Sequence, residues 1–205
     1  MLKLFHSTGS CSLASLIALE EAGADYEVVR MSTAAGDQRA PEYLAVNPKG
    51  RVPALVTERG VLTENVAILA YVAQAYPEAR LAPEDPWGFA QMQALNSYLA
   101  STVHVAHAHK HRGYRWASEE SSFEDMRRKV AQNEADCFRL IEAEYLKGPW
   151  VMGEQYTVAD GYLFTIADWL EGDGVDCRQF PKVFEHRERV RARPAVRKVL
   201  AEQAA

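Results

Sequence analysis

The chain has 205 residues, of which 48% are hydrophobic, and its formal net charge is -5. This length corresponds to one large domain or two small ones, and the hydrophobic fraction suffices for a substantial core. The negative charge argues against a nucleic-acid partner, and no apolar run approaches the roughly 20 residues that span a membrane. We therefore expect a globular protein that binds neither nucleic acid nor a membrane.

A cysteine stands where the first predicted strand gives way to the first helix. Leu2 to His6 is a short apolar run, and apolar residues then recur at helical spacing from Leu13 to Gly23. Cys11 therefore falls in the first turn of this helix, where unpaired N–H groups and the helix dipole stabilise an anion. The position predicts a thiol pKa below its free value of about 8.5, with a small buried side chain as the plainer alternative.

Two further patterns in the first third of the chain suggest a binding site. Pro53 lies at the end of Asn47-Pro-Lys-Gly-Arg-Val-Pro53, just before a predicted strand. The residues alone favour a trans bond, because only about 5–6% of X–Pro bonds in folded proteins are cis. A cis bond would turn the backbone of Val52 towards an extended, peptide-like ligand. Glu64 and Asn65 fall at a predicted helix N-terminus, where they can hold the charged groups of a ligand or merely cap the helix.

A proline-rich stretch divides the chain. Before about Tyr76 short strand-like runs alternate with helical patterns, whereas almost everything after Trp87 is helical. The three prolines within residues 77–86 favour an extended connection. We predict a small α/β layer-sandwich domain, a linker and a helical domain, over residues 1–79, 80–87 and 88–205 respectively.

Two patterns in the helical half are interpreted as structural. Thr157-Val-Ala-Asp160 is a variant of the capping box, in which Thr157 accepts a hydrogen bond from the first turn and Asp160 reaches back. Replacing Asp160 by Ala is expected to cost about 1 kcal/mol or somewhat more, as for other helix caps. An apolar stripe indicates core or a dimer interface, and its members are Trp87, Met92, Leu95, Tyr98 and Leu99.

A group of histidines raises the question of a metal site. His104, His107 and His111 share one helix face, and His109 lies beside them. No Asp or Glu accompanies them, and such faces are more often solvated or packed. We therefore predict no metal.

The cysteines indicate the redox environment. Cys11, Cys137 and Cys177 are odd in number and far apart, which argues against a disulfide framework or a four-ligand zinc site. They fit a reducing compartment. Because Met1 leads directly into a strand without a leader pattern, we expect a cytoplasmic location.

Four segments, taken together, resemble the cytosolic glutathione transferases, and most closely the bacterial beta class. They are Gly9-Ser-Cys-Ser12, Asn47 to Pro53, Leu62 to Leu69 and Tyr156 to Phe164, so the resemblance runs through both predicted domains in order. It implies a thioredoxin-like N-terminal domain that binds glutathione and an all-α C-terminal domain that shapes the electrophile site. It also implies a homodimer and favours a cis bond at Pro53.

The resemblance implies roles for individual residues. Cys11 and His104 match the two residues beside the glutathione sulfur, with His104 expected to titrate near neutrality. The backbone of Val52 would pair with the cysteinyl part of glutathione, while Glu64 and Asn65 would hold its γ-glutamyl group. The other glutathione-site candidates are Ser12, Arg51 and Pro53, with Lys49 an alternative to Arg51 at the glycyl carboxylate, and the electrophile-site candidates are Ser101, His107 and Trp169.

The predicted function is conjugation of reduced glutathione, a co-substrate, to small apolar electrophiles. Two alternatives stay open. Cys11 can itself be the reactive thiolate of a glutathione-dependent thiol-disulfide reductase, by a one-cysteine mechanism because Cys11-Ser-Leu-Ala14 lacks a second cysteine. The fold can also serve a non-catalytic protein that binds apolar ligands or another protein.

Overall fold

The computed structural model describes residues 1–204, and its N-terminal part is built on a four-stranded mixed sheet. The strand order is β2-β1-β3-β4, with β1 parallel to β2 and antiparallel to β3, and β3 antiparallel to β4. This sheet agrees with the predicted alternation of short strands and helices in an α/β layer sandwich. The strands are β1 (Leu2–His6), β2 (Tyr26–Arg30), β3 (Ala54–Thr57) and β4 (Gly60–Thr63).

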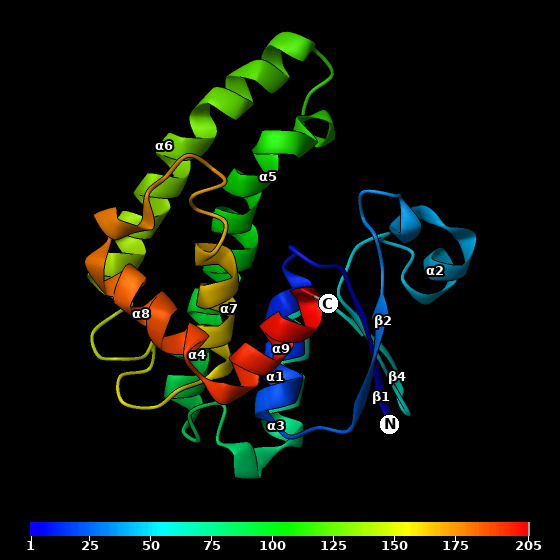
Figure 1. Cartoon of the computed structure of the whole chain (residues 1–205), viewed down its shortest axis with the longest axis vertical. Helices are drawn as coiled ribbons and strands as arrows, with labels where there is room; N and C mark the ends of the chain where they lie inside the picture. Colours follow the sequence, from blue (N-terminus) through cyan, green and yellow to red (C-terminus); the bar gives the residue numbers. More distant parts are fainter. Residues whose placement is uncertain (205) are drawn as a thin grey trace.

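Three helices accompany the sheet. They are α1 (Ser12–Glu21), α2 (Pro41–Val46) and α3 (Asn65–Ala75). Helices α1 and α3 lie between the sheet and the helical half of the molecule, whereas α2 lies on the other side of the sheet (Figure 1). The arrangement confirms the predicted thioredoxin-like domain, and it brings the start of α1 up against the helical half.

The second half is mainly helical, as predicted, and its longest non-helical stretch contains the isolated β-bridges Trp150–Gly153 and Met152–Gln155. A π-helical turn, Leu99–Val103, joins its first two helices, and a 3-10 turn, Gly113–Arg115, follows the second. The helices are α4 (Pro86–Tyr98), α5 (His104–Arg112), α6 (Glu120–Glu144), α7 (Val158–Ala167), α8 (Pro181–Arg191) and α9 (Pro194–Ala204). None of the described helices is both long and apolar enough to cross a membrane.

The two halves are joined by a short irregular segment. Pro77–Ala79 forms a 3-10 turn, and α4 then begins at Pro86, where the carboxylate of Asp85 accepts a hydrogen bond from the Gly88 N–H at 2.8 Å. The last two residues of the predicted linker, 86 and 87, therefore already belong to a helix. The domain division at residues 79 and 88 stays a prediction.

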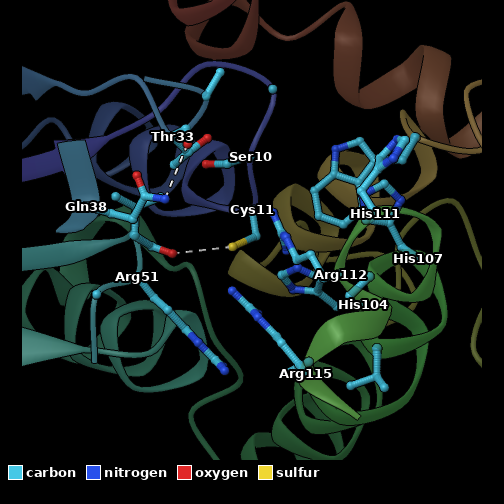
Figure 2. A pocket seen from close by; sticks show the side chains of 18 of the residues that line it. Ser10, Cys11, Thr33, Gln38, Arg51, His104, His107, His111, Arg112 and Arg115 are labelled. Atoms are coloured by element: carbon cyan, nitrogen blue, oxygen red, sulfur yellow. Dashed lines mark hydrogen bonds between the residues drawn. The ribbon is translucent and has the colours of Figure 1, made fainter. Parts of the chain in front are cut away.

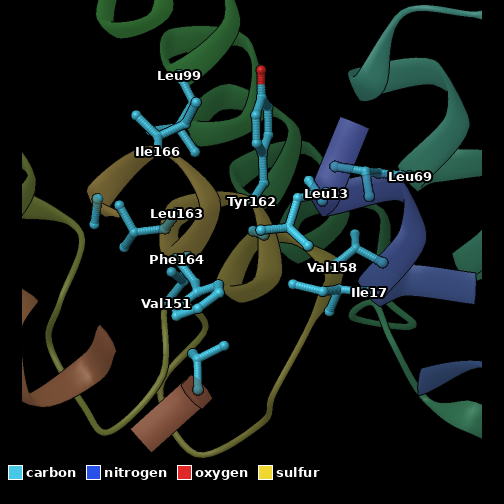
Figure 3. Packing of buried hydrophobic residues seen from close by; sticks show 14 of the residues in the cluster. Leu13, Ile17, Leu69, Leu99, Val151, Val158, Tyr162, Leu163, Phe164 and Ile166 are labelled. Atoms are coloured by element: carbon cyan, nitrogen blue, oxygen red, sulfur yellow. The ribbon is translucent and has the colours of Figure 1, made fainter. Parts of the chain in front are cut away.

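The core is continuous between the two halves, because α1 packs on the fully buried helix α7 (Figure 3). Leu13 and Ile17 of α1 lie among the residues of this core. A Cβ atom on Gly161 would stand 3.2 Å from Ile17 Cγ2 and 3.2 Å from Tyr156 Oη. Glycine at this position is what lets the two helices approach closely, and the contact holds the start of α1 in place.

The capping box and most of the apolar stripe of the helical half have the structural roles predicted for them. The capping box of Thr157 and Asp160 is confirmed at the start of α7. In the apolar stripe, Met92, Leu95 and Leu99 are fully buried, as predicted for core residues. Trp87 is 73% exposed, so it is no part of the core of this chain.

Candidate glutathione and electrophile site

A cavity of about 550 Å³ lies between the start of α1 and the segment before β3 on one side, and α5 with the turn after it on the other (Figure 2). We call these the thioredoxin wall and the helical wall. Helix packing across the core therefore brings together residues that are far apart in the sequence. The predicted site residues that line the cavity are Cys11, Arg51, Val52, His104, His107 and Trp169.

Cys11 lies at the N-terminus of α1, as predicted, but its pKa moves in the other direction. Its Sγ donates a hydrogen bond to the backbone carbonyl of Val52 at 3.6 Å. Loss of solvent raises the pKa of the Cys11 thiol to about 11, although the charges of Arg112 and Arg51 oppose the shift. The prediction of a lowered pKa is therefore wrong for the ligand-free protein, because burial outweighs the helix terminus and both arginines.

Ser12 and Asn65 fix the thioredoxin wall from within, and neither lines the cavity. The fully buried Ser12 hydroxyl lies 2.8 Å from His6 Nδ1 and 2.6 Å from the Ser10 hydroxyl. The Asn65 side chain accepts a hydrogen bond from Ser15 at 2.6 Å and donates one to the Cys11 carbonyl at 2.7 Å. Both side chains are thus engaged with the protein and help to position Cys11, and their contact with glutathione stays a prediction.

Glu64, also outside the cavity lining, begins α3 with a strained backbone and an exposed side chain. Its φ is 73°, and its carboxylate accepts a hydrogen bond from Lys49 Nζ at 2.6 Å. Lys49 is therefore already paired, whereas Arg51 lines the cavity. The Val52-Pro53 bond is cis, as the resemblance implied, and Pro53 itself is buried behind the lining residues.

His104 of α5 faces the cavity as a neutral ring. Burial, and then the positive charge of Arg112, lower the pKa of His104 to about 3. The expectation that it titrates near neutrality is wrong, because the packed helical wall removes the water that would solvate an imidazolium. The ring meets Trp169 edge-on at a centroid distance of 5.1 Å.

The electrophile-site candidates divide into two that line the cavity and one that does not. His107 stacks on Trp169 at a centroid distance of 4.3 Å, and its Nδ1 lies 2.6 Å from Asp173 Oδ2. Ser101 is exposed, donates to the carbonyl of Ser97 at 2.8 Å and lies outside the cavity lining, so its place in the electrophile site stays a prediction. Within residues 1–204 no group of three or more His, Cys, Asp or Glu side chains can hold a metal.

Several residues of the cavity were not singled out from the sequence. Arg112 and Arg115 belong to the helical wall, and Arg39 and Gln38 to the opposite side. Arg112 and Arg115 follow His104 by eight and eleven positions, which is the spacing of one helix face, so this signal was present in the sequence. Nothing in the local sequence marks Arg39 or Gln38, since only the tertiary fold brings them to the cavity.

Comparison with known proteins agrees with this architecture. Residues 1–74 match the family model described as glutathione S-transferase, N-terminal domain, and residues 108–203 the corresponding C-terminal domain. The chain is 30% identical to glutathione S-transferase GstA of Escherichia coli, over 98% of both chains. The chain belongs to the glutathione S-transferase family.

Solved structures of this family superpose closely on the chain. A glutathione transferase homologue from Sulfitobacter, solved with bound glutathione, is 48% identical, with a TM-score of 0.96 over 98% of each chain. A beta-class glutathione S-transferase from Sphingomonas chungbukensis is 32% identical, with a TM-score of 0.85 over 98% of each chain. The cavity thus belongs to a fold in which glutathione binding is directly observed in a relative.

Proposed function

We propose that this protein is a beta-class glutathione transferase that joins reduced glutathione to small electrophiles with an apolar body. The observation that carries the proposal is the placement of Cys11 at the start of α1, in a cavity that also opens onto the aromatic side chain of Trp169. A thiol on one wall and an aromatic surface on the other are what glutathione and an apolar electrophile need. The bound glutathione of the Sulfitobacter homologue supports it.

Glutathione would lie along the thioredoxin wall. The backbone of Val52 would pair with its cysteinyl part, and Arg51, which lines the cavity, would hold the glycyl carboxylate. The N-terminus of α3, through the free N–H groups of Glu64 and Asn65, would receive the γ-glutamyl carboxylate. The Glu64 carboxylate would bind the ammonium group, which would have to displace Lys49 Nζ from that carboxylate.

Conjugation needs the glutathione thiolate rather than a Cys11 thiolate. With its pKa raised to about 11, Cys11 is a thiol at neutral pH and can donate its S–H to the glutathione sulfur. The proton of glutathione leaves to water, the sulfur forms a bond to the electrophilic carbon, and the leaving group departs with the bonding electron pair. Neutral His104 would supply a second N–H donor to the developing anion.

Titration calorimetry of reduced glutathione into the wild type and Glu64→Ala tests the binding site. We expect the wild type to bind and the variant to bind more weakly, because the ammonium of the ligand loses its partner. Arg59→Gln, an exposed change in the β3–β4 turn, serves as the control. Absence of binding to the wild type would contradict both enzymatic functions and make the non-catalytic alternative the leading one.

The reductase alternative differs in the fate of Cys11. There the Cys11 thiolate would attack the glutathione sulfur of a mixed disulfide, which releases the partner thiol and leaves glutathione disulfide-bonded to Cys11. The thiolate of a second glutathione would then attack this bond, forming glutathione disulfide and regenerating the Cys11 thiolate. The protonated state of Cys11 in the ligand-free cavity favours conjugation over this route. Cys11→Ala separates them: lost conjugation supports the hydrogen-bond role, whereas retained conjugation with lost reduction of hydroxyethyl disulfide supports exchange.

The homodimer implied by the family resemblance and the cytoplasmic location expected from the sequence are part of the proposal. The 73% exposed Trp87 at the start of α4 is an apolar surface that a second copy can cover. Light scattering coupled to gel filtration is expected to give twice the 22.9 kDa of one chain. A monomer at micromolar concentration would contradict the dimer.

A further inference from the structure

The charged residues that line the cavity are all basic. Its lining includes four arginines, Arg39, Arg51, Arg112 and Arg115, and three histidines, but no Asp or Glu among the described residues. The chain as a whole has more acidic than basic residues, 28 against 23, so a surface drawn from it at random would be mixed. The lining therefore departs from the charge of the rest of the protein.

These arginines are also unpaired within residues 1–204. None of the four forms an ion pair or a side-chain hydrogen bond with a described residue. Arg39 and Arg51 are exposed, but Arg112 and Arg115 are partly buried. By contrast, the buried Arg187 pairs with Glu171 at 2.8 Å, and the partly buried Arg193 Nη2 with Glu21 Oε2 at 2.7 Å. Unpaired guanidinium groups at a cavity are available for an anion.

The four arginines lie on opposite sides of the cavity. Arg51 comes from the thioredoxin wall, whereas Arg112 and Arg115 come from the end of α5 and the turn after it (Figure 2). Arg39 comes from a 3-10 turn, Asp37–Arg39, in the same half of the chain as Arg51. Burial and the nearby charge of Arg115 lower the pKa of Arg112, so the helical-wall pair carries an unrelieved repulsion. A bound anion would relieve it.

Glutathione does not account for the helical-wall pair. In the proposed function its γ-glutamyl carboxylate lies at the start of α3 and its glycyl carboxylate at Arg51, both on the thioredoxin wall. The charge of Arg112 also acts on the Cys11 thiol, but neither glutathione carboxylate is placed at Arg112 or Arg115. Both arginines line the cavity with the exposed aromatic rings of Tyr114 and Trp116 and the half-buried ring of Trp169. A positively charged pair among aromatic surfaces fits a molecule with an apolar body and an acidic group.

We infer that the electrophile carries an organic oxyanion, a carboxylate or sulfonate, which Arg112 and Arg115 bind while its apolar body packs on the aromatic rings of the helical wall. This inference rests on the proposed function and narrows its substrate class from apolar electrophiles to anionic ones. The two arginines determine specificity by charge, and the thioredoxin wall supplies the nucleophile.

A matched pair of chlorinated probes tests the inference, namely 4-chloro-3,5-dinitrobenzoate and its neutral methyl ester. In both, the glutathione sulfur bonds to the ring carbon that carries chlorine, chloride leaves with the bonding pair, and the thiol proton goes to water. We expect the acid to have the higher kcat/KM. Because the preference is electrostatic, its advantage is expected to shrink as ionic strength rises.

Variants of the helical wall then test whether Arg112 and Arg115 cause the preference for the acid. Arg112→Gln and Arg115→Gln are each expected to lower kcat/KM for the acid roughly 10- to 100-fold, the usual effect of losing a charge-assisted contact. For the ester, kcat/KM is expected to fall less than about threefold in the same two variants. The control Arg59→Gln is expected to behave as the wild type with both probes. Circular dichroism and thermal unfolding establish that each variant is folded.

Distinct outcomes overturn the inference and the proposed function. Equal losses for acid and ester would show that the arginines do not recognise the anion. Equal losses of kcat/KM together with a weaker affinity for glutathione would show that the two arginines bind glutathione instead.

Turnover of neither probe would contradict conjugation and leave the anion site to a binding measurement. Calorimetry with 3,5-dinitrobenzoate and its methyl ester, in the presence of S-methylglutathione, then decides. Tighter binding of the acid, abolished by Arg115→Gln, supports the site, and equal binding refutes it.

Discussion

Two histidine–aspartate pairs in the helical half share one chemistry but lie in different surroundings. In the first, His186 Nε2 on α8 donates to Asp160 Oδ1 on α7 at 2.8 Å, and both side chains are almost wholly buried. In the second, His107 on α5 and Asp173 after α7 approach to 2.6 Å, but the His107 side chain is 23% exposed and lines the cavity. The first pair is closed and the second opens onto the site.

The difference shows how surroundings assign roles to the same two side chains. Asp160 is saturated by the protein, because it also accepts hydrogen bonds from the N–H groups of Val151 and Thr157, each at 2.7 Å. Asp173 instead holds His107 and Lys110 in place beside the cavity. We therefore expect changes to the first pair to affect folding and changes to the second to affect substrate binding.

Asp160→Ala is expected to have the largest effect. Its loss leaves His186 and two backbone N–H groups buried without partners, so the free energy of unfolding should fall by roughly 3–5 kcal/mol. This exceeds the cost of about 1 kcal/mol that a helix cap alone would suggest. Urea unfolding measures it, and a loss no larger than that of Asp85→Ala, an exposed helix cap, would contradict the closed network.

Near the second pair lies a buried carboxyl group, that of Glu134, which makes the stability of the protein depend on pH. Burial, and then the charge of Asp173, raise the pKa of Glu134 to about 8. Between pH 4.5 and 8 the folded protein keeps a proton that the unfolded chain loses, so stability falls as pH rises through this range. The wild type is therefore penalised at pH 8 and not below pH 4.5.

Glu134→Gln should remove that penalty. We expect it to stabilise the protein by roughly 2–4 kcal/mol at pH 8 and by little at pH 4.5, as measured by urea unfolding at the two values. Glu124→Gln, an exposed change on the same helix, serves as the control. A gain that is equal at both pH values would show that packing, rather than ionisation, is responsible.

Asp173→Asn is expected to have the smallest effect on stability and the clearest effect on the site. It weakens contacts that are only partly buried, so a loss of about 1 kcal/mol is expected. His107 stacks on Trp169 and would lose the charged partner that holds it there. The KM for the electrophile should therefore rise several-fold, while the affinity for glutathione is unchanged. A destabilisation as large as that of Asp160→Ala would abolish the distinction between the two pairs.

Local features of the fold were readable from the residues. The strand ending before Cys11, the capping box of Thr157 and Asp160, and the change from α/β to helical sequence after residue 87 all follow from spacing and cap chemistry along a few turns of chain. The cis bond at Pro53 was different, since the residues alone favoured trans and only the family resemblance indicated it. Periodicity is enough where neighbours in sequence are neighbours in space.

Properties of the site depended on contacts that no local pattern contains. Ser12 and Asn65 turn their side chains into the protein because His6 and Ser15 supply partners there. The thiol pKa of Cys11 rises because a second wall, from the other half of the chain, removes its water. Desolvation and charge are set by whatever packs around a group, so residue types near Cys11 indicated a nucleophile site, whereas its protonation and its arginine-lined cavity followed only from the assembled fold.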